Sequence, residues 1–290
     1  MSEVLEKRRL GPDVFRMELV YPKLARKARP GQFVIVRASE DGERIPLTIA
    51  DADPKAGSIT LIFQVVGKST TLLSRLEPGD EILDVVGPLG VPTEIKRFGR
   101  VLCVGGGIGA APLYPIAKAL KAAGNAVTSI LGGRSKNLVI LENEFRAISD
   151  AVVVTTDDGT YGRKGFVTDA LKDLLGAGPG APGFDRAWAI GPVPMMKAVC
   201  DLARRAGIPT VVSLNPIMVD GTGMCGGCRV IVGGKVKFAC VDGPEFDGHA
   251  VDFDTLAKRL TTYRDRERRD HEACKIGLDG PCDKDAGANG

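Results

Sequence analysis

Three cysteines and one aspartate near the C-terminal end of the chain have the spacing of a metal centre. In the segment MVDGTGMCGGCRV, four residues separate Asp220 from Cys225 and two separate Cys225 from Cys228, and Cys240 follows after eleven more. The plant-type 2Fe-2S pattern is C-x4-C-x2-C and a distant Cys, so the spacing matches it with Asp220 in the first ligand position. The intervening glycines allow tight bends and offer amides to sulfur. The segment therefore predicts a 2Fe-2S cluster held by three thiolates and one carboxylate.

The spacing alone leaves other interpretations open. Zinc could be held by the same thiols, although a zinc ribbon would have a second clustered pair where Cys240 stands alone. Free thiols are a further alternative. Asp220 could also be a turn residue, because a short acidic side chain beside a glycine commonly forms turns. We expect two other cysteines, Cys103 and Cys200, to be small buried apolar residues.

A glycine-rich turn has the spacing of a dinucleotide site. The segment RVLCVGGGIGAAPL contains Gly105-x-Gly107-x-x-Ala110, together with Gly106 and Gly109, between a strand pattern and a helix pattern. Amides at the start of that helix would face a pyrophosphate. No acidic residue follows the second strand, and Arg134 stands there instead. Arg134 could accept the 2′-phosphate of NADP(H) or be a surface residue, so the turn predicts nucleotide binding without choosing between NAD(H) and NADP(H). Glycines that serve packing alone are the other reading.

The elements around these motifs predict three folded units. Strand-like runs at 15–22, 31–39, 45–51, 58–67 and 80–90 indicate an antiparallel β barrel or sandwich over residues 1–98. Alternating strand and helix patterns over 99–214 indicate a doubly wound α/β domain with a parallel sheet. Residues 215–250 form the cysteine-rich module, in which Gly233-Gly234 marks a hairpin turn.

Residues 251–290 are predicted to contain one helix and a tail. The helix continues to about residue 268 and is capped by Asp252 or Asp254. From Asp270 the sequence is polar and glycine-rich, which predicts disorder. We therefore expect no metal site there, although the tail contains three potential ligands, His271, Cys274 and Cys282.

Composition excludes several classes of function. The chain has 290 residues and a net charge of +3 with mixed signs, which argues against a nucleic-acid partner, as does the aromatic content of 5%. The longest uncharged stretch, 101–117, is too short and too rich in Gly and Pro for a membrane span. No secretion signal is recognisable, and seven cysteines, an odd number, suit reduced thiols, so we expect a cytoplasmic protein.

The combination of a β-rich first unit, a GGGIG nucleotide unit and a C-terminal 2Fe-2S loop resembles the ferredoxin-NADP reductase superfamily. Within it, the chain resembles dihydroorotate dehydrogenase electron-transfer subunits and, more narrowly, small subunits of NADH-dependent reduced ferredoxin:NADP+ oxidoreductases, also called sulfide dehydrogenase β-type subunits. The narrower resemblance depends on ERIPLTIAD, on Asp220 in place of a cysteine, and on the helix FDTLAKRLTTYRDRE. It covers about residues 1–268.

This resemblance implies the residues that bind the flavin and the nucleotide. FAD would lie on the barrel strand of Pro46, Leu47 and Thr48, with Thr48 near flavin N5 and Arg44 displaced by one position from the usual phosphate-binding arginine. A second segment, a strand end and the turn after it, would hold the FAD pyrophosphate; it comprises Gln64, Val65, Val66, Gly67, Lys68, Ser69 and Thr70. The alternative interpretation of this turn is a hairpin turn with a helix cap. The pyridine-nucleotide cleft would be lined by Asp157, Asp158, Gly191 and Pro192, and the resemblance favours NAD(H).

The same resemblance implies a flavoprotein iron-sulfur oxidoreductase subunit. NADH would deliver hydride to FAD N5, and single electrons would leave through the 2Fe-2S cluster to a larger flavin and 4Fe-4S subunit, with ferredoxin served indirectly in electron bifurcation. The helix over 256–268 could dock that partner or pack on its own domain. One alternative is the electron-transfer subunit of dihydroorotate dehydrogenase. The other is a non-catalytic regulatory subunit that binds zinc and nucleotide.

Overall fold

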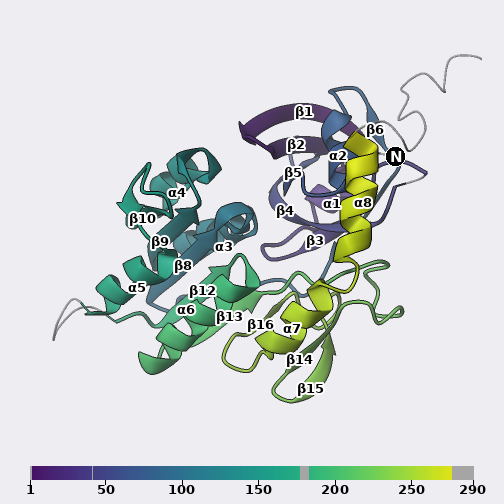
Figure 1. Ribbon diagram of the computed structural model, residues 1–290. Coiled ribbons are helices and arrows are strands. Elements are labelled where there is room, and N and C mark those ends of the chain that lie inside the picture. The colour runs from purple at the N-terminus through teal and green to yellow at the C-terminus, as the bar shows by residue number, and fades with distance from the viewer. Residues whose placement is uncertain (1, 41, 177–182, 276–290) are drawn as a thin grey trace, which may run out of the picture.

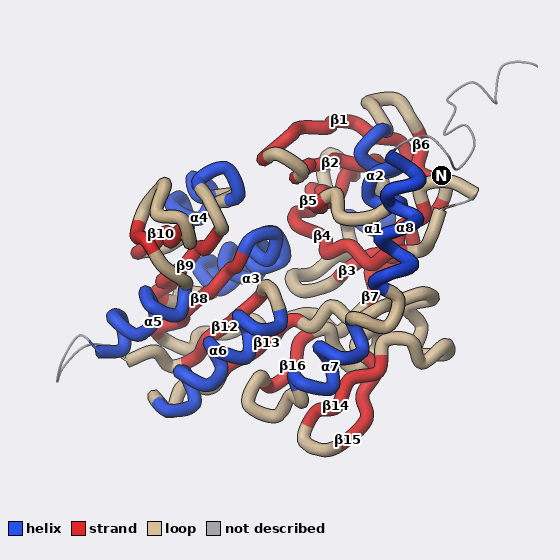
Figure 2. Tube along the Cα trace, viewed as in Figure 1, coloured by secondary structure: helices blue, strands red, loops and turns tan. Residues whose placement is uncertain are grey.

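The computed structural model describes residues 2–40, 42–176 and 183–275. These residues form two seven-stranded sheets and one two-stranded hairpin (Figure 1). The two large sheets lie side by side, and the hairpin lies next to the edge of the second (Figure 2). The Gly- and Pro-rich composition of segment 176–184 predicts a surface connection within the α/β unit, and this segment lies almost wholly outside the described residues.

The first sheet is a nearly closed antiparallel barrel with the strand order β6-β1-β2-β5-β4-β3-β7. Its strands bury alternate or consecutive apolar residues, such as Met17 and Leu19 of β2, in a core of their own. The strands are β1 (Ser2–Gly11), β2 (Val14–Val20), β3 (Phe33–Arg37), β4 (Ile45–Asp53), β5 (Ser58–Gln64), β6 (Glu81–Ile82) and β7 (Asp84–Leu89). Two short helices, α1 (Pro22–Ala25) and α2 (Lys68–Arg75), cover it.

The second sheet has the order β11-β10-β9-β8-β12-β13-β16, in which all neighbours are parallel except β13 and β16. Helices α3 and α4 pack on one face and α5 and α6 on the other, so the sheet is doubly wound. The strands are β8 (Arg100–Gly106), β9 (Ala126–Gly133), β10 (Ala151–Thr156), β11 (Arg163–Lys164), β12 (Arg186–Ile190), β13 (Thr210–Ser213) and β16 (Glu245–Asp247). The helices are α3 (Ala110–Ala122), α4 (Glu142–Ile148), α5 (Val167–Gly176) and α6 (Val193–Arg205), and two short 3-10 turns are η1 (Gly107–Gly109) and η2 (Lys136–Leu138).

The cysteine-rich module is an insertion between β13 and β16 of the parallel sheet. Its hairpin joins β14 (Arg229–Val232) to β15 (Lys235–Phe238) through Gly233 and Gly234, which have φ values of 58° and 73°. Positive φ at both positions is the requirement of a type I′ turn, so the predicted hairpin is confirmed. Because β16 returns to the sheet, the module is held at both ends by the α/β unit.

The C-terminal region differs from its prediction. The structure has two helices, α7 (Phe253–Leu260) and α8 (Arg264–Lys275), so the prediction of one helix to about residue 268 is wrong. Asp252 caps α7 as expected, with its carboxylate accepting from Thr255 N at 2.9 Å. Helix α8 lies beside α2 of the barrel (Figure 1), and its Cys274 is buried. The prediction of disorder from Asp270 is therefore wrong up to residue 275, and Cys282 lies outside the described residues.

The break between α7 and α8 follows from side-chain chemistry. Leu256 of α7 is buried in the core shared with the cysteine-rich module, which favours packing on its own unit over partner docking. In contrast, α8 is almost entirely charged, and it contacts α2 through His271 and the Cys274 carbonyl. The two helices therefore make different contacts, and the chain turns between them at residues 261–263.

Candidate functional site

The predicted cluster ligands lie at the base of the hairpin, Asp220, Cys225 and Cys228 before β14 and Cys240 after β15, and they form two pairs. Cys228 Sγ lies 3.2 Å from Cys240 Sγ, and both side chains are buried. Asp220 accepts hydrogen bonds from Thr222 N at 2.8 Å and from Cys225 N at 3.0 Å, and the Cys225 side chain is exposed. Within the described ranges, no three His, Cys, Asp or Glu side chains converge as a metal site. The structure thus brings Cys228 and Cys240 together and ties Asp220 to the Cys225 backbone.

The chemistry of these donors fits a cationic iron centre. Burial, and then the neighbouring Cys228, raise the pKa of the Cys240 thiol to about 12. Two adjacent buried thiolates would repel each other, whereas a bound cation deprotonates coordinating thiols outright. Backbone amides, first that of Thr222, hold the pKa of Asp220 below its usual value, so the carboxylate is charged at neutral pH. The loop therefore offers sulfur donors together with one ionised oxygen donor.

The loop rests directly on the barrel at Gly221. Gly221 has φ of +77°, and a Cβ there would lie 2.7 Å from Leu89 Cδ1 and 3.0 Å from Ile35 Cγ1. Only glycine combines that backbone conformation with so close an approach. Phe33 and Ile35 of β3 belong to the same core as Cys228 and Cys240, and this core joins the module to the barrel.

The predicted flavin residues occupy the neighbouring strand and the first turn of α2. In β4, Thr48 pairs with Phe33, Leu47 with Val34 and Pro46 with Ile35, and the three β4 residues are partly exposed. Gln64 ends β5, and Val65, Val66 and Gly67 lead into α2, which begins with Lys68, Ser69 and Thr70. Thr70 Oγ1 accepts from Val66 N at 3.0 Å and from Gly67 N at 3.1 Å, so part of this turn is a helix cap.

Two buried polar atoms among these residues lack a partner. Ser69 Oγ, in a residue 7% exposed, and Arg44 Nε make no hydrogen bond with any residue that the structure describes. A buried donor without a partner is costly, and such groups are rare in native structures. A diphosphate at the start of α2 would supply acceptors for a hydroxyl in that position. The turn therefore fits the pyrophosphate of FAD, and it also provides the helix cap.

The predicted nucleotide residues gather at one edge of the parallel sheet. Gly105 and Gly106 end β8, Gly107 and Gly109 form η1, and Gly191 follows β12, the neighbour of β8. A Cβ at Gly109 would overlap the Ile190 carbonyl and lie 2.8 Å from Gly191 Cα. The strand order reverses between β8 and β12, and open α/β sheets bind ligands at such a point.

The remaining cleft residues lie at the same carboxyl edge. Arg134 follows β9 and is exposed; Asp157 and Asp158 follow β10 and are also exposed. Asp157 N donates to Gly133 O at 3.1 Å and Asp158 N to Arg134 O at 3.2 Å, which joins the two turns. Pro192 is the N-cap of α6. The structure therefore brings all the predicted nucleotide residues to one edge of the sheet. The sequence did not indicate Met195, whose side chain occupies the space that a Cβ at Gly106 or Gly191 would need.

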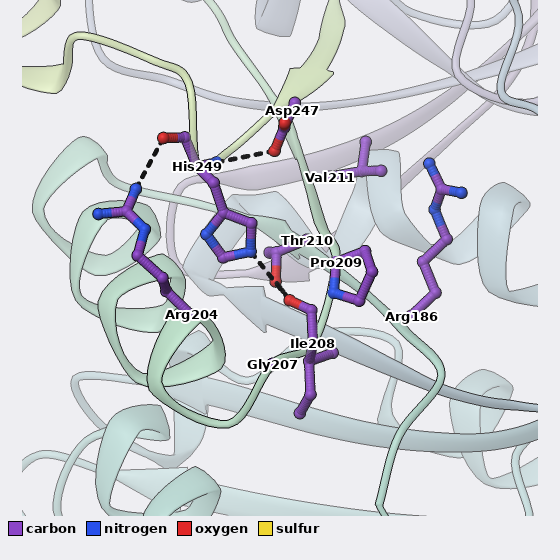
Figure 3. A pocket seen from close by; sticks show the side chains of 9 residues that line it. All are labelled: Arg186, Arg204, Gly207, Ile208, Pro209, Thr210, Val211, Asp247 and His249. Carbon is purple, nitrogen blue, oxygen red and sulfur yellow. Dashed lines mark hydrogen bonds between the residues drawn. The ribbon is translucent and has the colours of Figure 1, made fainter.

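A cavity of about 390 Å³ lies elsewhere, at the amino ends of β12 and β13. Figure 3 shows Arg204, Asp247 and His249 around it, with the His249 ring bonded to the Ile208 carbonyl at 2.9 Å. Because the glycine turn lies at the carboxyl ends of β8 and β12, at the opposite edge of the same parallel sheet, this cavity is separate from the dinucleotide edge.

Comparison with known proteins places the chain among electron-transfer flavoproteins. Residues 215–252 match the model of the iron-sulfur cluster binding domain of dihydroorotate dehydrogenase B. A Thermotoga maritima dihydroorotate dehydrogenase B (NAD(+)) electron transfer subunit homolog is 54% identical over 94% of this chain and 95% of its own length. The Geobacillus thermodenitrificans electron transfer subunit is 38% identical over 84% of this chain and 94% of its own.

Solved structures agree with the sequence relatives. The structure of an NADH-dependent reduced ferredoxin-NADP oxidoreductase, described in connection with flavin-based electron bifurcation, matches with a TM-score of 0.88 and 54% identity, covering 94% of this chain and 97% of that one. An Amycolatopsis cytochrome P450 reductase matches with a TM-score of 0.60 and 26% identity, covering 71% of this chain and 65% of that one.

The fold and the site define an NAD(P)H-dependent flavoprotein oxidoreductase subunit with FAD and an iron-sulfur cluster. The chain belongs to the family of dihydroorotate dehydrogenase B electron transfer subunits and their homologs, within the ferredoxin-NADP reductase superfamily. The predicted fold class, cofactors and electron-transfer role are confirmed. As an electron transfer subunit, the chain works within a multi-subunit complex. No described helix is long and apolar enough to cross a membrane.

Proposed function

We propose that this chain takes electrons from NADH and passes them, through FAD and a 2Fe-2S cluster, to a larger flavin and 4Fe-4S subunit that performs ferredoxin:NADP+ electron bifurcation. The observation that carries the proposal is the 54% identity, over nearly the whole of both chains, to a structure described for NADH-dependent reduced ferredoxin-NADP oxidoreductase. The FAD, NAD(H) and cluster sites would lie in residues 1–98, 99–214 and 215–250 respectively. We also place the protein in the cytoplasm, because an odd number of cysteines, three of them with cluster-ligand spacing, suits a reducing compartment.

The chain's own residues would position the three groups. Gly107 and Gly109, which lie just before α3 at the carboxyl edge of the sheet, would offer backbone amides to a pyrophosphate. Thr48 presents a hydroxyl on the barrel strand next to Phe33, which shares a core with the cluster loop. When bound, FAD accepts an electron pair from a nicotinamide and releases single electrons, the exchange that a one-electron cluster requires.

Cluster binding would use Cys225, Cys228, Cys240 and Asp220. The two buried thiols supply the inner side of the loop, and the exposed Cys225 with Asp220 supplies the outer side. This arrangement would place one edge of the cluster near the surface, where electrons can leave the chain.

Exposed apolar residues stand next to three of the predicted ligands in the sequence: Val219 precedes Asp220, Met224 precedes Cys225 and Val241 follows Cys240. Val219, Met224 and Val241 are 49%, 86% and 44% exposed, and a Cβ at Gly223 would lie 3.1 Å from Val241 Cγ2. Exposed apolar residues clustered around a functional loop are typical of protein contact sites. We propose that this surface, Val219-Met224-Val241, contacts the larger subunit, and that α7, with Leu256 buried, does not.

Native mass spectrometry of the complex purified through this chain tests the proposal. We expect the partner to carry flavin and two or more iron-sulfur clusters. We also expect the purified complex to reduce NADP+ with NADH and reduced ferredoxin. Met224→Asp should weaken the complex without loss of cofactors, whereas Val236→Asp, at an exposed hairpin residue, is the matched control. A partner that oxidises dihydroorotate would instead select the pyrimidine-pathway alternative, and a colourless zinc protein would contradict both.

A further inference from the structure

The connection between the barrel and the parallel sheet, residues 90–99, is held on two sides. Thr93 N donates to Pro30 O at 2.9 Å, and Gln32 Nε2 donates to Gly90 O at 2.9 Å, which fixes the connection to the chain just before β3. On the other side, Val91 N donates to Gly243 O at 2.6 Å. The connection therefore lies between the barrel and the segment that follows Cys240.

A side-chain hydrogen bond closes this junction. Thr93 Oγ1 donates to Glu245 Oε1 at 2.7 Å, across 152 positions of sequence, and Thr93 is 8% exposed. Gly31 packs on both groups, because a Cβ there would overlap Thr93 Oγ1 and lie 3.4 Å from Glu245 Oε1. Gly31 has φ of +83°, so the close approach and the backbone conformation both require glycine.

Glu245 is an unusual residue for its place in the fold. It is the first residue of the edge strand β16, where it pairs with Ser213 of β13, and its carboxyl group lies within the junction against Thr93. Burial disfavours its charge, and the groups that act on it are the Thr93 hydroxyl, the Trp188 indole and the Arg186 guanidinium. Cys103 of β8 also lies within electrostatic range. A carboxyl kept in such surroundings needs a reason beyond strand pairing.

The junction connects the proposed sites in a short path. Glu245 is five residues after Cys240. On the barrel side, Gln32 O accepts from Ile49 N at 3.1 Å, and Phe33 pairs with Thr48. The Thr93–Glu245 hydrogen bond thus links the segment that follows Cys240 to the residues that flank the proposed flavin strand. Thr93 itself lies in the connection that leads into β8 of the parallel sheet.

From this geometry we propose that Glu245 is a positioning residue: through Thr93 it fixes the cluster module relative to the flavin strand, and it is required for electron passage to the cluster and not for NADH binding. The inference rests on the proposed function, because it assigns the junction a part in that electron path. Electron transfer depends on the placement of the two cofactors, which the protein supplies.

The test uses the cofactor-loaded chain and four substitutions. Thr93→Val removes the hydroxyl with little change of shape, Thr93→Ser restores it, and Glu245→Leu removes the acceptor. Ser58→Ala is the control, because Ser58 Oγ makes a comparable bond of 2.6 Å to Glu18 inside the barrel. The first readout is the rate of amide hydrogen exchange over residues 89–95. The second is a stopped-flow experiment with NADH, which measures the rate of flavin bleaching and the rate of cluster bleaching separately.

Thr93→Val and Glu245→Leu are each expected to accelerate exchange over residues 89–95 about tenfold. They should slow the cluster phase by about tenfold or more and leave the flavin phase and the NADH dissociation constant unchanged. The double variant should be no slower than either single variant, since both act through one bond. Thr93→Ser and Ser58→Ala should behave as the wild type.

Three results would overturn the inference: wild-type exchange in Thr93→Val, a wild-type cluster phase despite faster exchange, or an equal slowing in Ser58→Ala. Failure of the proposed function is recognised separately, because the wild-type chain itself would then show no NADH-driven cluster phase. The exchange measurement needs no turnover, so it reports on the junction in either case.

Discussion

Substitution of Gly109 by alanine should disable the nucleotide site without disturbing the other two. The new Cβ would overlap the Ile190 carbonyl oxygen, lie 2.6 Å from the carbonyl carbon and 2.8 Å from Gly191 Cα. All three atoms belong to backbone, so no side-chain rotation relieves the overlap, and η1 and β12 must separate by roughly 1 Å. Such overpacking costs about 1–3 kcal/mol of unfolding free energy. A displacement of ~1 Å between positioning groups can reduce a rate by ~10²-fold.

We therefore expect kcat/KM for NADH to fall ~100-fold in Gly109→Ala, equivalent to about 2.7 kcal/mol of transition-state stabilisation. The assay is NADH-dependent reduction of an artificial acceptor, with FAD and iron content measured on the same sample. Gly176→Ala is the control, because Gly176 ends α5 and no atom of the described part of the chain lies within 4 Å of its Cβ position. Wild-type kinetics in Gly109→Ala, or an equal loss in Gly176→Ala, would refute the placement of the nucleotide between β8 and β12.

Three further predictions concern the other groups. Ser69→Ala should raise the FAD dissociation constant about tenfold in equilibrium dialysis, without lowering the stability of the FAD-free chain, because Ser69 Oγ has no hydrogen-bond partner among the described residues. Cys228→Ser should abolish iron binding in metal analysis, whereas Cys200→Ala, at a buried thiol outside the loop, should retain it. Burial raises the pKa of Glu245 from 4.5 to about 7. The folded chain then keeps a proton that the unfolded chain has lost, so the unfolding free energy should fall as pH rises from about 4.5 to 7, by about 3 kcal/mol at most. Glu245→Gln should remove that fall in denaturant titrations; an identical pH profile in the two proteins would show that Glu245 titrates normally.

Much of the fold follows from local patterns. The glycine turn, the strand-helix alternation after residue 99 and the Gly233-Gly234 hairpin each have a local physical cause that the sequence displays. Cys103 and Cys200 are buried as expected. The cluster ligands could be proposed from spacing because a loop that wraps a cluster is itself a local structure.

Other features could not be predicted because they depend on distant partners. Strand β1 begins at Ser2, yet the segment SEVLEKRRLG is so charged that no strand is predicted before Phe15. It forms because β2 and β6 pair with it on either side and bury Val4. Helix α8 likewise has too few apolar residues to indicate burial, so its continuation from about residue 268 to Lys275 and its contact with α2 are not predicted from the sequence. The Thr93–Glu245 bond joins residues with no pattern in common.

Anaerobic titration of the purified chain with NADH tests the central claim, that one polypeptide joins nicotinamide oxidation to an iron-sulfur centre. After reconstitution we predict one FAD and about two irons and two sulfides per chain, with NADH bleaching the absorption of both the flavin and the cluster. Zinc in place of iron at Cys225, Cys228 and Cys240, or a flavin that NADH reduces while the cluster stays oxidised, would contradict the account.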